Sequence, residues 1–373
     1  MRGGAEEYVL KMATAATTKG WDVHVAFPKR VSTAALRYDF SEIGACYHPL
    51  EIPPEAMGMK LFLIKIVRTL VLLLRIKPDA VHLSLPSFDQ CMASMAACAL
   101  LIIPTVIVFH LVPEWFPVGR KYLKLCHWAR MRNQQWISIS ENNRELLSKL
   151  FHVSIKDIEL IYNGPFFSND DGLKTNKAAI ACEVRKELGI FEETIILTVG
   201  RLCSQKGYSY MIPAIPHILK NHPNIRFVWV GDGDQRRELE LLVKEYGVED
   251  KVIFLGYRKD IPRLLLASDL FLFPTLYEGC PLVLFEAMEF GLPIVASKAS
   301  GIPEVVEDNV HGVLFRKADS CSLLAELNWA LDHPDKMNEM AASASKRVKE
   351  FSSEKMTDKT LRVLLDMAEE AVK

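Results

Sequence analysis

The sequence lacks four features that would assign it to a simple class of protein. No apolar run reaches the ~20 residues that a membrane span needs, and no apolar core follows the basic start as in a signal peptide. The net charge of -1 gives no basic excess of the kind that binds nucleic acid. The eight cysteines form no Cys-x-x-Cys pair and no cluster with histidine. This pattern argues against a zinc site or a disulfide framework and fits reduced thiols in a cytoplasmic protein.

The chain has 373 residues, which is enough for two domains. Short apolar strands alternate with helices, a pattern that predicts an α/β protein with doubly wound parallel sheets. A polar stretch from Phe167 to Lys177 is interpreted as a linker, which gives domains 1–166 and 167–352. The expected strands are Val23–Phe27, Ala80–Leu85, Thr105–Phe109, Trp136–Ile139, Ile158–Tyr162, Ile195–Val199, Phe227–Val230, Val252–Phe254, Leu270–Phe273, Pro293–Ala296 and Val313–Phe315.

Both ends of the chain carry helical patterns. A helix over Ala5–Lys19 directly follows Gly3-Gly4, whereas a doubly wound domain normally opens on a strand. We therefore expect the first strand of the N-terminal domain to be missing. The tail 353–373 has an apolar stripe through Met356, Leu361, Leu364 and Leu365, and is expected to pack back onto the first domain.

The helix expected over Lys60–Lys77 is apolar on most sides and has a basic edge. The edge consists of Lys60, Lys65, Arg68, Arg75 and Lys77. Such a helix can lie on an anionic lipid surface, or it can pack inside the domain with its cations extended to water. The sequence leaves both interpretations open.

The segment Tyr277–Met288 combines a turn, the start of a helix and two glutamates eight positions apart. Gly279 lets the backbone approach a ligand closely, and Pro281 suits a first helical position. The amides at the helix start form an anion site. Glu278 lies in the turn, and Glu286 lies about two helical turns beyond it. Amides for phosphate and carboxylates for hydroxyl groups together suit a nucleotide-sugar.

A second candidate segment follows the strand Ile195–Val199. Gly200 comes directly after this strand, at the edge where α/β sheets bind ligands. Arg201 and Lys206 project from the loop, and two fixed cations would neutralise a diphosphate leaving group. Taken alone, the pair is also what an ordinary surface loop presents.

The run Gly231-Asp232-Gly233-Asp234 contains an Asp-x-Asp, which raises the question of a metal. It also contains part of a dinucleotide fingerprint, but no third glycine follows at the required spacing. Such a run is more typical of a turn and helix cap. We expect no metal at the site.

In this order and spacing, the motifs resemble those of a family-four retaining glycosyltransferase of the GT-B architecture. The resemblance covers essentially the whole chain and implies two Rossmann-like domains facing a cleft. The first would bind the acceptor and the second the nucleotide-sugar donor. The motifs are Gly3-Gly4-Ala5-Glu6, Ile139-Ser140, Asn163-Gly164, Val199-Gly200-Arg201-Leu202, Lys206-Gly207, Val230-Gly231-Asp232-Gly233, Phe254-Leu255-Gly256, Ala267-Ser268-Asp269, Phe273-Pro274, Glu278 to Met288, Gly291-Leu292-Pro293 and Gly301-Ile302-Pro303-Glu304.

The resemblance implies roles for individual residues. Arg201 and Lys206 match the residues that hold the donor diphosphate. Glu286 matches the residue that binds the ribose hydroxyls, and Glu278 the one beside the transferred sugar. His110, at a strand end in the first domain, is expected to face the cleft near that sugar. The remaining expected contacts are the amides of Gly279, Cys280, Leu282 and Val283, with Tyr257 and Arg258 near the base.

The implied activity is a metal-independent, hexosyltransferase-type reaction in polysaccharide biosynthesis. It needs no cofactor, and its donor is a UDP-sugar or a GDP-sugar. The acceptor is a saccharide or a lipid-linked molecule, with no nucleic acid involved. Contact of the first domain with the inner face of the membrane is an open option. Two alternatives remain: a non-catalytic sugar-nucleotide binder, and a phosphorylase-like enzyme that uses free phosphate.

Overall fold

The computed structural model describes residues 3–51, 58–86, 92–112, 114, 118–166 and 176–372. These form two compact α/β units, one of Met1–Asn163 with Ser353–Lys373, the other of Gly164–Ser352. The division falls three residues before the expected boundary at residue 166. Most of the expected linker, residues 167–175, lies outside the described residues, and its last residue, Lys177, begins helix α8.

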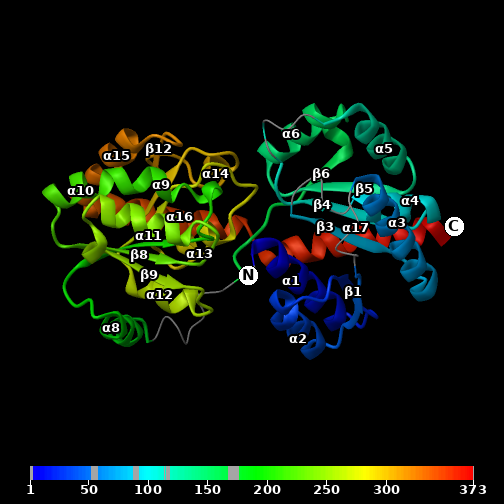
Figure 1. The fold of residues 1–373 in the computed structure, drawn as a ribbon, viewed down its shortest axis with the longest axis horizontal. Helices are drawn as coiled ribbons and strands as arrows, with labels where there is room; N and C mark the ends of the chain where they lie inside the picture. The colour runs from blue at the N-terminus through cyan, green and yellow to red at the C-terminus, as the bar shows by residue number, and fades with distance from the viewer. Residues whose placement is uncertain are drawn as a thin grey trace. The chain divides into compact units, whose positions relative to one another are not determined.

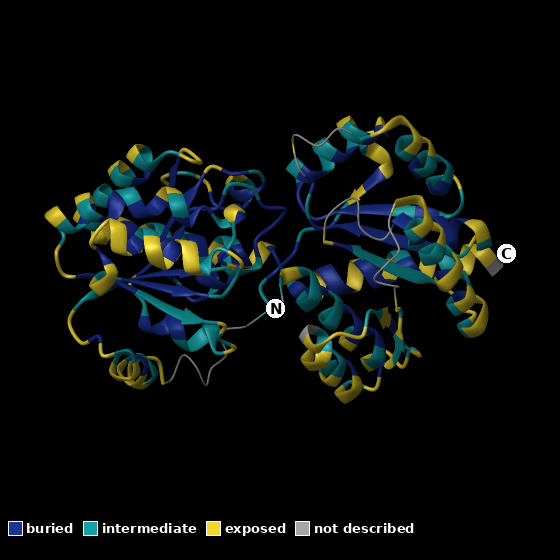
Figure 2. Ribbon diagram, in the orientation of Figure 1, coloured by how far each residue is buried: buried dark blue, intermediate teal, exposed yellow. Residues whose placement is uncertain are grey.

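The second unit is built on a six-stranded parallel sheet with the order β12-β11-β10-β7-β8-β9. The central strands are apolar along most of their length and are dark blue in Figure 2, because helices cover both faces of the sheet. The strands are β7 Thr194–Val199, β8 Ile225–Val230, β9 Val252–Gly256, β10 Leu270–Phe273, β11 Ile294–Ser297 and β12 Val313–Phe315. The helices are α8 Lys177–Leu188, α9 Tyr208–Met211, α10 Ile215–Asn221, α11 Arg236–Glu245, α12 Ile261–Ala267, α13 Leu282–Glu289, α14 Ile302–Val305, α15 Ser320–Asp332 and α16 Pro334–Arg347.

The strand order of this sheet fixes where a ligand would bind. From β7 the chain winds outward through β8 to β9, and from β10 it winds the other way through β11 to β12. β7 and β10 are therefore neighbours whose following loops diverge. In open α/β sheets the crevice at the carboxyl ends of two such strands is the usual ligand site.

The first unit has its described strands in two sheets. A four-stranded parallel sheet has the order β3-β4-β5-β6, and a two-stranded parallel sheet pairs β1 with β2. Among the described residues no strand joins β1 to β3, so the doubly wound sheet is interrupted where a first strand would lie. The strands are β1 His24–Phe27, β2 Cys46–Pro49, β3 Val81–Leu85, β4 Thr105–Phe109, β5 Gln134–Ser138 and β6 Ile158–Leu160.

The helices of the first unit include the end of the chain. They are α1 Gly4–Thr18, α2 Ala34–Glu42, α3 Gly58–Ile76, α4 Met92–Leu101, α5 Arg120–Arg130, α6 Glu141–Phe151 and α17 Ser353–Val372. α17 packs beside α1 and β4, as the red and blue helices of Figure 1 show. Lys19 pairs with Asp358 at 3.1 Å, and the Tyr8 hydroxyl lies 3.4 Å from that of Thr360. Of the apolar stripe expected on this helix, Leu365 is exposed.

Helix α3 is apolar, and among the described residues its apolar contacts with α4 lie on one side. Leu70 and Leu73 meet Ala97 and Cys98 of α4. A second stripe, which we call the α3 stripe, faces water and consists of Met59, Leu63, Val67, Val71 and Leu74, each more than half exposed. One of the two interpretations left open was that the helix is packed inside the domain. That interpretation does not hold for the exposed face formed by the α3 stripe. In the described part of the chain, no helix is both long enough and apolar enough to cross a bilayer.

Candidate functional site

The loops after β7 and β10 carry the predicted donor-site residues at the carboxyl ends of these neighbouring strands. The β7 loop is held by close backbone contact with the loop after β8. A Cβ on Gly231 would lie 2.0 Å from the Gly200 carbonyl oxygen, and one on Gly233 would lie 2.2 Å from that of Leu202. The glycines of the Gly-Asp-Gly run are therefore required by packing between loops.

Lys206 and Glu278 form an ion pair that joins the β7 and β10 loops. Lys206 Nζ lies 2.5 Å from Glu278 Oε1, which also accepts a hydrogen bond of 2.8 Å from the Thr275 hydroxyl. The ammonium group also lies 5.0 Å from the centre of the Phe273 ring. Only 14% of the Lys206 side chain and 9% of the Glu278 side chain are exposed. The partial burial strengthens the pair and fixes the position of the cation.

The same two loops are also locked through Gln205. The side-chain NH₂ group of Gln205 donates to the backbone carbonyl of Tyr277 at 2.9 Å. The backbone carbonyl of Gln205 accepts from the Leu276 amide at 2.8 Å. Gln205 Oε1 in turn accepts a long bond of 3.4 Å from Arg201 Nη2. The exposed Arg201 and the partly buried Lys206 are thus presented by one braced loop.

Helix α13 provides the amides and the second glutamate. Pro281 is its N-cap and Leu282 its first residue, so the amides of Leu282 and Val283 have no carbonyl partner within the helix. Gly279 and Cys280 are buried just before it. Glu286 lies four residues after the helix start, which is about one turn and not the two turns expected from the sequence. Its side chain is buried at 6% exposure.

Tyr257 and Arg258, expected near the base, follow β9. In the sheet β9 is separated from β7 by β8, and because the strands are parallel their following loops lie at the same edge. Tyr257 is 48% exposed. The Arg258 guanidinium lies 2.7 Å from Asp260 and 2.8 Å from Glu187, which raises its pKa further and occupies its hydrogen-bonding fork. A contact of Tyr257 with the base stays a prediction.

The acidic pair of the Gly-Asp-Gly-Asp run has local partners. The Asp232 carboxylate accepts a 2.8 Å hydrogen bond from the Gly233 amide and lies 4.0 Å from Arg236. Asp234 comes just before α11. These contacts are those of a turn that leads into a helix.

His110 belongs to the other unit, at the end of β4. Its Nε2 lies 2.7 Å from the Ser84 hydroxyl, and its ring meets the Tyr8 ring edge-on at 4.7 Å. Burial, with a smaller contribution from His82, lowers the His110 pKa to about 3. His110 is therefore a neutral imidazole near pH 7, able to exchange hydrogen bonds but carrying no charge.

Sequence reasoning missed the residues that support these side chains. Thr275 and Gln205 hold Glu278 and the β10 loop, and each stands within three positions of a predicted residue, so proximity was an available signal. Tyr8 of α1 and His82 of β3 lie near His110. Both are far from His110 in the sequence, so proximity could not have indicated them. Burial lowers the His82 pKa to about 4, and its Nε2 has no hydrogen-bond partner among the described residues.

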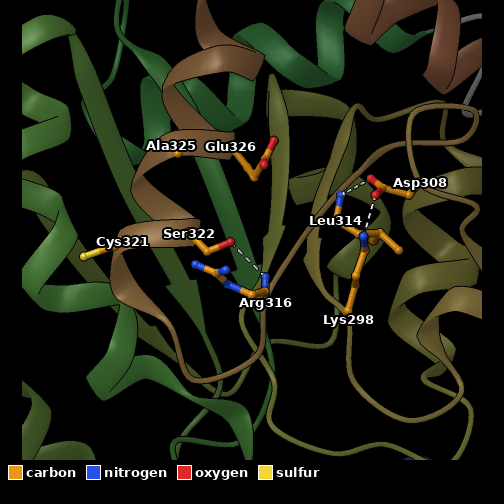
Figure 3. Close-up of a pocket in the computed structure, with 8 residues that line it drawn as sticks. All are labelled: Lys298, Asp308, Leu314, Arg316, Cys321, Ser322, Ala325 and Glu326. Carbon is orange, nitrogen blue, oxygen red and sulfur yellow. Dashed lines mark hydrogen bonds and ion pairs between the residues drawn. The ribbon is translucent and has the colours of Figure 1, made fainter.

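A surface hollow in the second unit is lined by Lys298, Asp308, Leu314, Arg316, Cys321, Ser322, Ala325 and Glu326 (Figure 3). Lys298 pairs with Asp308 at 2.7 Å, and the Arg316 amide donates to the Ser322 hydroxyl at 3.0 Å. None of the predicted site residues lines it. Because the hollow lies away from the loops after β7 and β10 that carry the predicted donor-site residues, we do not assign it to the donor.

Two Rossmann-like domains, with paired loops at the switch point of the second, define the GT-B class of glycosyltransferase. The family model "Glycosyl transferases group 1" matches residues 182–347, and "Glycosyltransferase Family 4" matches residues 2–165. The chain belongs to this glycosyltransferase family, and the architecture expected from its motifs is confirmed.

Curated relatives match over part of their length. An uncharacterized glycosyltransferase of Methanocaldococcus jannaschii is 35% identical over 48% of this chain and 46% of its own. The UDP-Gal:α-D-GlcNAc-diphosphoundecaprenol α-1,3-galactosyltransferase of Escherichia coli is 31% identical over 66% of this chain and 65% of its own. The chain thus spans between about half and two thirds of these relatives in the matched regions.

Solved structures match over nearly the whole chain at low identity. A glycosyltransferase from Rickettsia africae superimposes with a TM-score of 0.82 at 16% identity, over 98% of this chain and 95% of that one. HepE of Anabaena in complex with UDP-glucose gives a TM-score of 0.80 at 22% identity, over 98% and 97%. At these identities the likeness establishes the fold.

Proposed function

We propose that this protein transfers a sugar from a nucleoside diphosphate donor to a saccharide or lipid-linked acceptor, with retention of anomeric configuration. The observation that carries the proposal is the Lys206–Glu278 pair at the β7/β10 switch point, beside the start of α13. Lipid-diphosphate acceptors and UDP-sugar donors appear in the names of relatives, including the Escherichia coli galactosyltransferase. The group 1 family match supports the same class of reaction.

In this proposal the β7 loop receives the diphosphate. Lys206 and Arg201 neutralise the negative charge that grows on the leaving group as the bond to the sugar breaks. Glu278, which accepts a hydrogen bond from Thr275, holds Lys206 in place. Glu278 would therefore act on the leaving group through the lysine, as well as lying beside the sugar. The first amides of α13, which have no carbonyl partner within the helix, donate to phosphate oxygens or to the oxygens of sugar hydroxyls.

The reaction then proceeds on one face of the sugar. The acceptor hydroxyl attacks from the side that the diphosphate leaves, and a departing phosphate oxygen takes the hydroxyl proton. Because phosphate charge is neutralised by Lys206 and Arg201, the scheme requires no metal. His110, as a neutral imidazole, would hydrogen-bond a sugar hydroxyl.

A thermal-shift screen with UDP, GDP, ADP and inorganic phosphate tests donor binding. A ligand at 100 times its dissociation constant adds about 2.7 kcal/mol to the free energy of unfolding. The nucleotide that raises the melting temperature most therefore carries the preferred base. Hydrolysis of the matching nucleotide-sugars, with and without added phosphate, then tests catalysis. Binding without any turnover would favour a non-catalytic sugar-nucleotide binder, and phosphate-dependent turnover a phosphorylase.

Replacing Glu286 with alanine is expected to weaken donor binding by about 10–100-fold. A hydrogen bond to a charged group contributes about 1.5–3 kcal/mol, and the ribose hydroxyls would lose theirs. Isothermal titration with the preferred nucleoside diphosphate measures the change. Glu289→Ala, in the last turn of the same helix, is the matched control and should bind normally. Equal affinities in the two variants would remove Glu286 from the donor site.

We also propose that the first domain meets an anionic membrane through helix α3. The α3 stripe supplies apolar surface, and the flanking Lys60, Lys65, Arg68 and Arg75 supply charge that anionic lipid attracts. A lipid-linked acceptor would be delivered at that surface. The stripe lies on the outer face of α3, away from its contacts with α4.

The double substitution Leu63→Ser and Val67→Ser, which we call the α3 variant, is expected to lower the affinity for phosphatidylglycerol vesicles by about tenfold or more. Each substitution removes apolar side-chain area that would otherwise enter the bilayer. Co-sedimentation with these vesicles and with phosphatidylcholine vesicles measures it. Serine at Phe191 and Leu241, two exposed apolar residues of the other unit, provides the control. An unchanged vesicle affinity in the α3 variant would exclude this surface.

A further inference from the structure

Strand pairing brings three metal-ligating side chains together on one face of the β1–β2 sheet. The register places His24 opposite Cys46 and Ala26 opposite His48. Since paired residues in parallel strands point to the same side, His24, Cys46 and His48 share a face. Val25 and Tyr47 occupy the other face, which packs into an apolar cluster with Phe40. Nothing in the proposed transfer reaction uses this group.

The ligand atoms of the three residues are close enough to share one ion. One ring nitrogen of His24, the Sγ atom of Cys46 and one ring nitrogen of His48 all lie within 4.8 Å of one another. The distance between Nδ1 of His24 and Nε2 of His48 is 2.8 Å, and the two rings stack with their centres 5.1 Å apart. Two nitrogens and a sulfur around a tetrahedral ion at bond lengths of about 2.0–2.3 Å stand about 3.3–3.7 Å apart. Small side-chain rotations therefore bring this group into coordination.

The Asp22 carboxylate lies beside the ring nitrogen of His24 that faces away from His48. Asp22 Oδ2 lies 3.3 Å from His24 Nε2. A proton on Nε2 is then held by the carboxylate, which leaves the lone pair of Nδ1 directed toward His48. This carboxylate–histidine arrangement is the one that orients imidazole ligands in metal sites.

We propose that His24, Cys46 and His48 bind a zinc ion, with a water or an exogenous ligand in the fourth position. Two imidazoles and a thiolate suit zinc among divalent ions. The bound form carries the Cys46 thiolate and releases the thiol proton to solvent. The positive charge of Arg75 acts on His48 and opposes the cation, whereas Cys46 and Asp22 favour it.

The proposed site differs from the sequence-based expectation of no zinc site, and it would have a structural consequence. The three residues are scattered in the sequence, so only the pairing of β1 with β2 groups them. A two-stranded sheet is marginally stable by itself. An ion held by ligands from both strands would cross-link this sheet, which has no described strand between it and β3.

Cobalt titration of the full chain tests the site. The protein is prepared reduced and without a histidine tag, and Co²⁺ is added until absorption saturates. We expect one equivalent with a thiolate-to-metal band that Zn²⁺ abolishes. Cys46→Ser should lose the band, while Cys321→Ser, which alters an exposed cysteine of the other unit, should keep it. Absence of saturable uptake, or an unchanged band in Cys46→Ser, would overturn the proposal.

Asp22→Asn separates a metal site from a cluster that merely packs. Loss of an outer-shell partner typically lowers metal affinity about 10–100-fold, so this variant should need more Zn²⁺ to saturate while still binding one equivalent. Zn²⁺ should also raise the melting temperature of the parent chain and have no such effect on His24→Ala. Equal zinc affinities for the parent chain and Asp22→Asn would contradict the assigned geometry.

Discussion

Replacing Lys206 with alanine is expected to lower kcat/KM for sugar transfer by about 100–1,000-fold. This is the usual loss when one preorganised group that stabilises transition-state charge is removed. Lys206 is the better fixed of the two cations of the β7 loop, since its ammonium is held by Glu278 at 2.5 Å. Arg201, exposed on the same loop, would retain part of the charge stabilisation. Steady-state kinetics with the preferred nucleotide-sugar measures the loss.

The control for this substitution lies in the same domain. Lys298 follows β11 and pairs with Asp308 at 2.7 Å, so Lys298→Ala also removes a lysine from an ion pair at the carboxyl side of the sheet (Figure 3). Its activity should stay close to that of the parent chain. A comparable loss in Lys298→Ala would show that the effect of Lys206→Ala is general destabilisation.

A second variant distinguishes loss of the cation from a stranded carboxylate. Lys206→Ala leaves the buried Glu278 carboxylate with the hydrogen bond from Thr275 but without its cation, and an unpaired buried charge is destabilising by about 3–5 kcal/mol. Adding Glu278→Ala removes that charge as well. Stability should then recover while activity stays low, because the diphosphate still lacks its cation. Recovery of activity in the double variant would exclude Lys206 from catalysis.

The sequence predicted the second domain well because its signals are local. β10 and β12 begin and end at the predicted residues, since each is a short apolar run bounded by polar or turn residues. The placement of Lys206 and Glu278 at one switch point also follows from strand order, which the glycine-rich turns and family motifs indicate. The assignment of individual site roles remains a prediction.

What the sequence could not supply depends on contacts between distant segments. β2 was missed because Cys46–Pro49 carries no alternating apolar pattern and ends in proline. The Lys206–Glu278 bond joins residues 72 positions apart, so the bracing role of Glu278 appears only when the loops are in place. For helix α3, hydrophobicity alone did not distinguish the packed face from the exposed α3 stripe.

Replacing Gly207 with alanine is expected to destabilise the second domain by about 2–6 kcal/mol. Gly207 has φ of +69°, and a Cβ there would lie 2.0 Å from the Pro274 carbonyl oxygen. A left-handed backbone costs a non-glycine residue about 1–3 kcal/mol, and displacing packed backbone adds about as much again. Since Pro274 begins the β10 loop, the shift would separate Lys206 from Glu278 and lower activity as well.

Gly189→Ala isolates the two causes of this destabilisation. Gly189 has φ of +68°, almost the same as Gly207, but no atom lies within 4 Å of its added Cβ. Gly189→Ala should therefore cost only the backbone term, about 1–3 kcal/mol. Urea unfolding followed by circular dichroism measures both variants. The excess loss in Gly207→Ala is then the cost of placing a methyl group against the Pro274 carbonyl, where the β7 and β10 loops meet. If both variants lose the same stability, the contact with Pro274 does not hold the site.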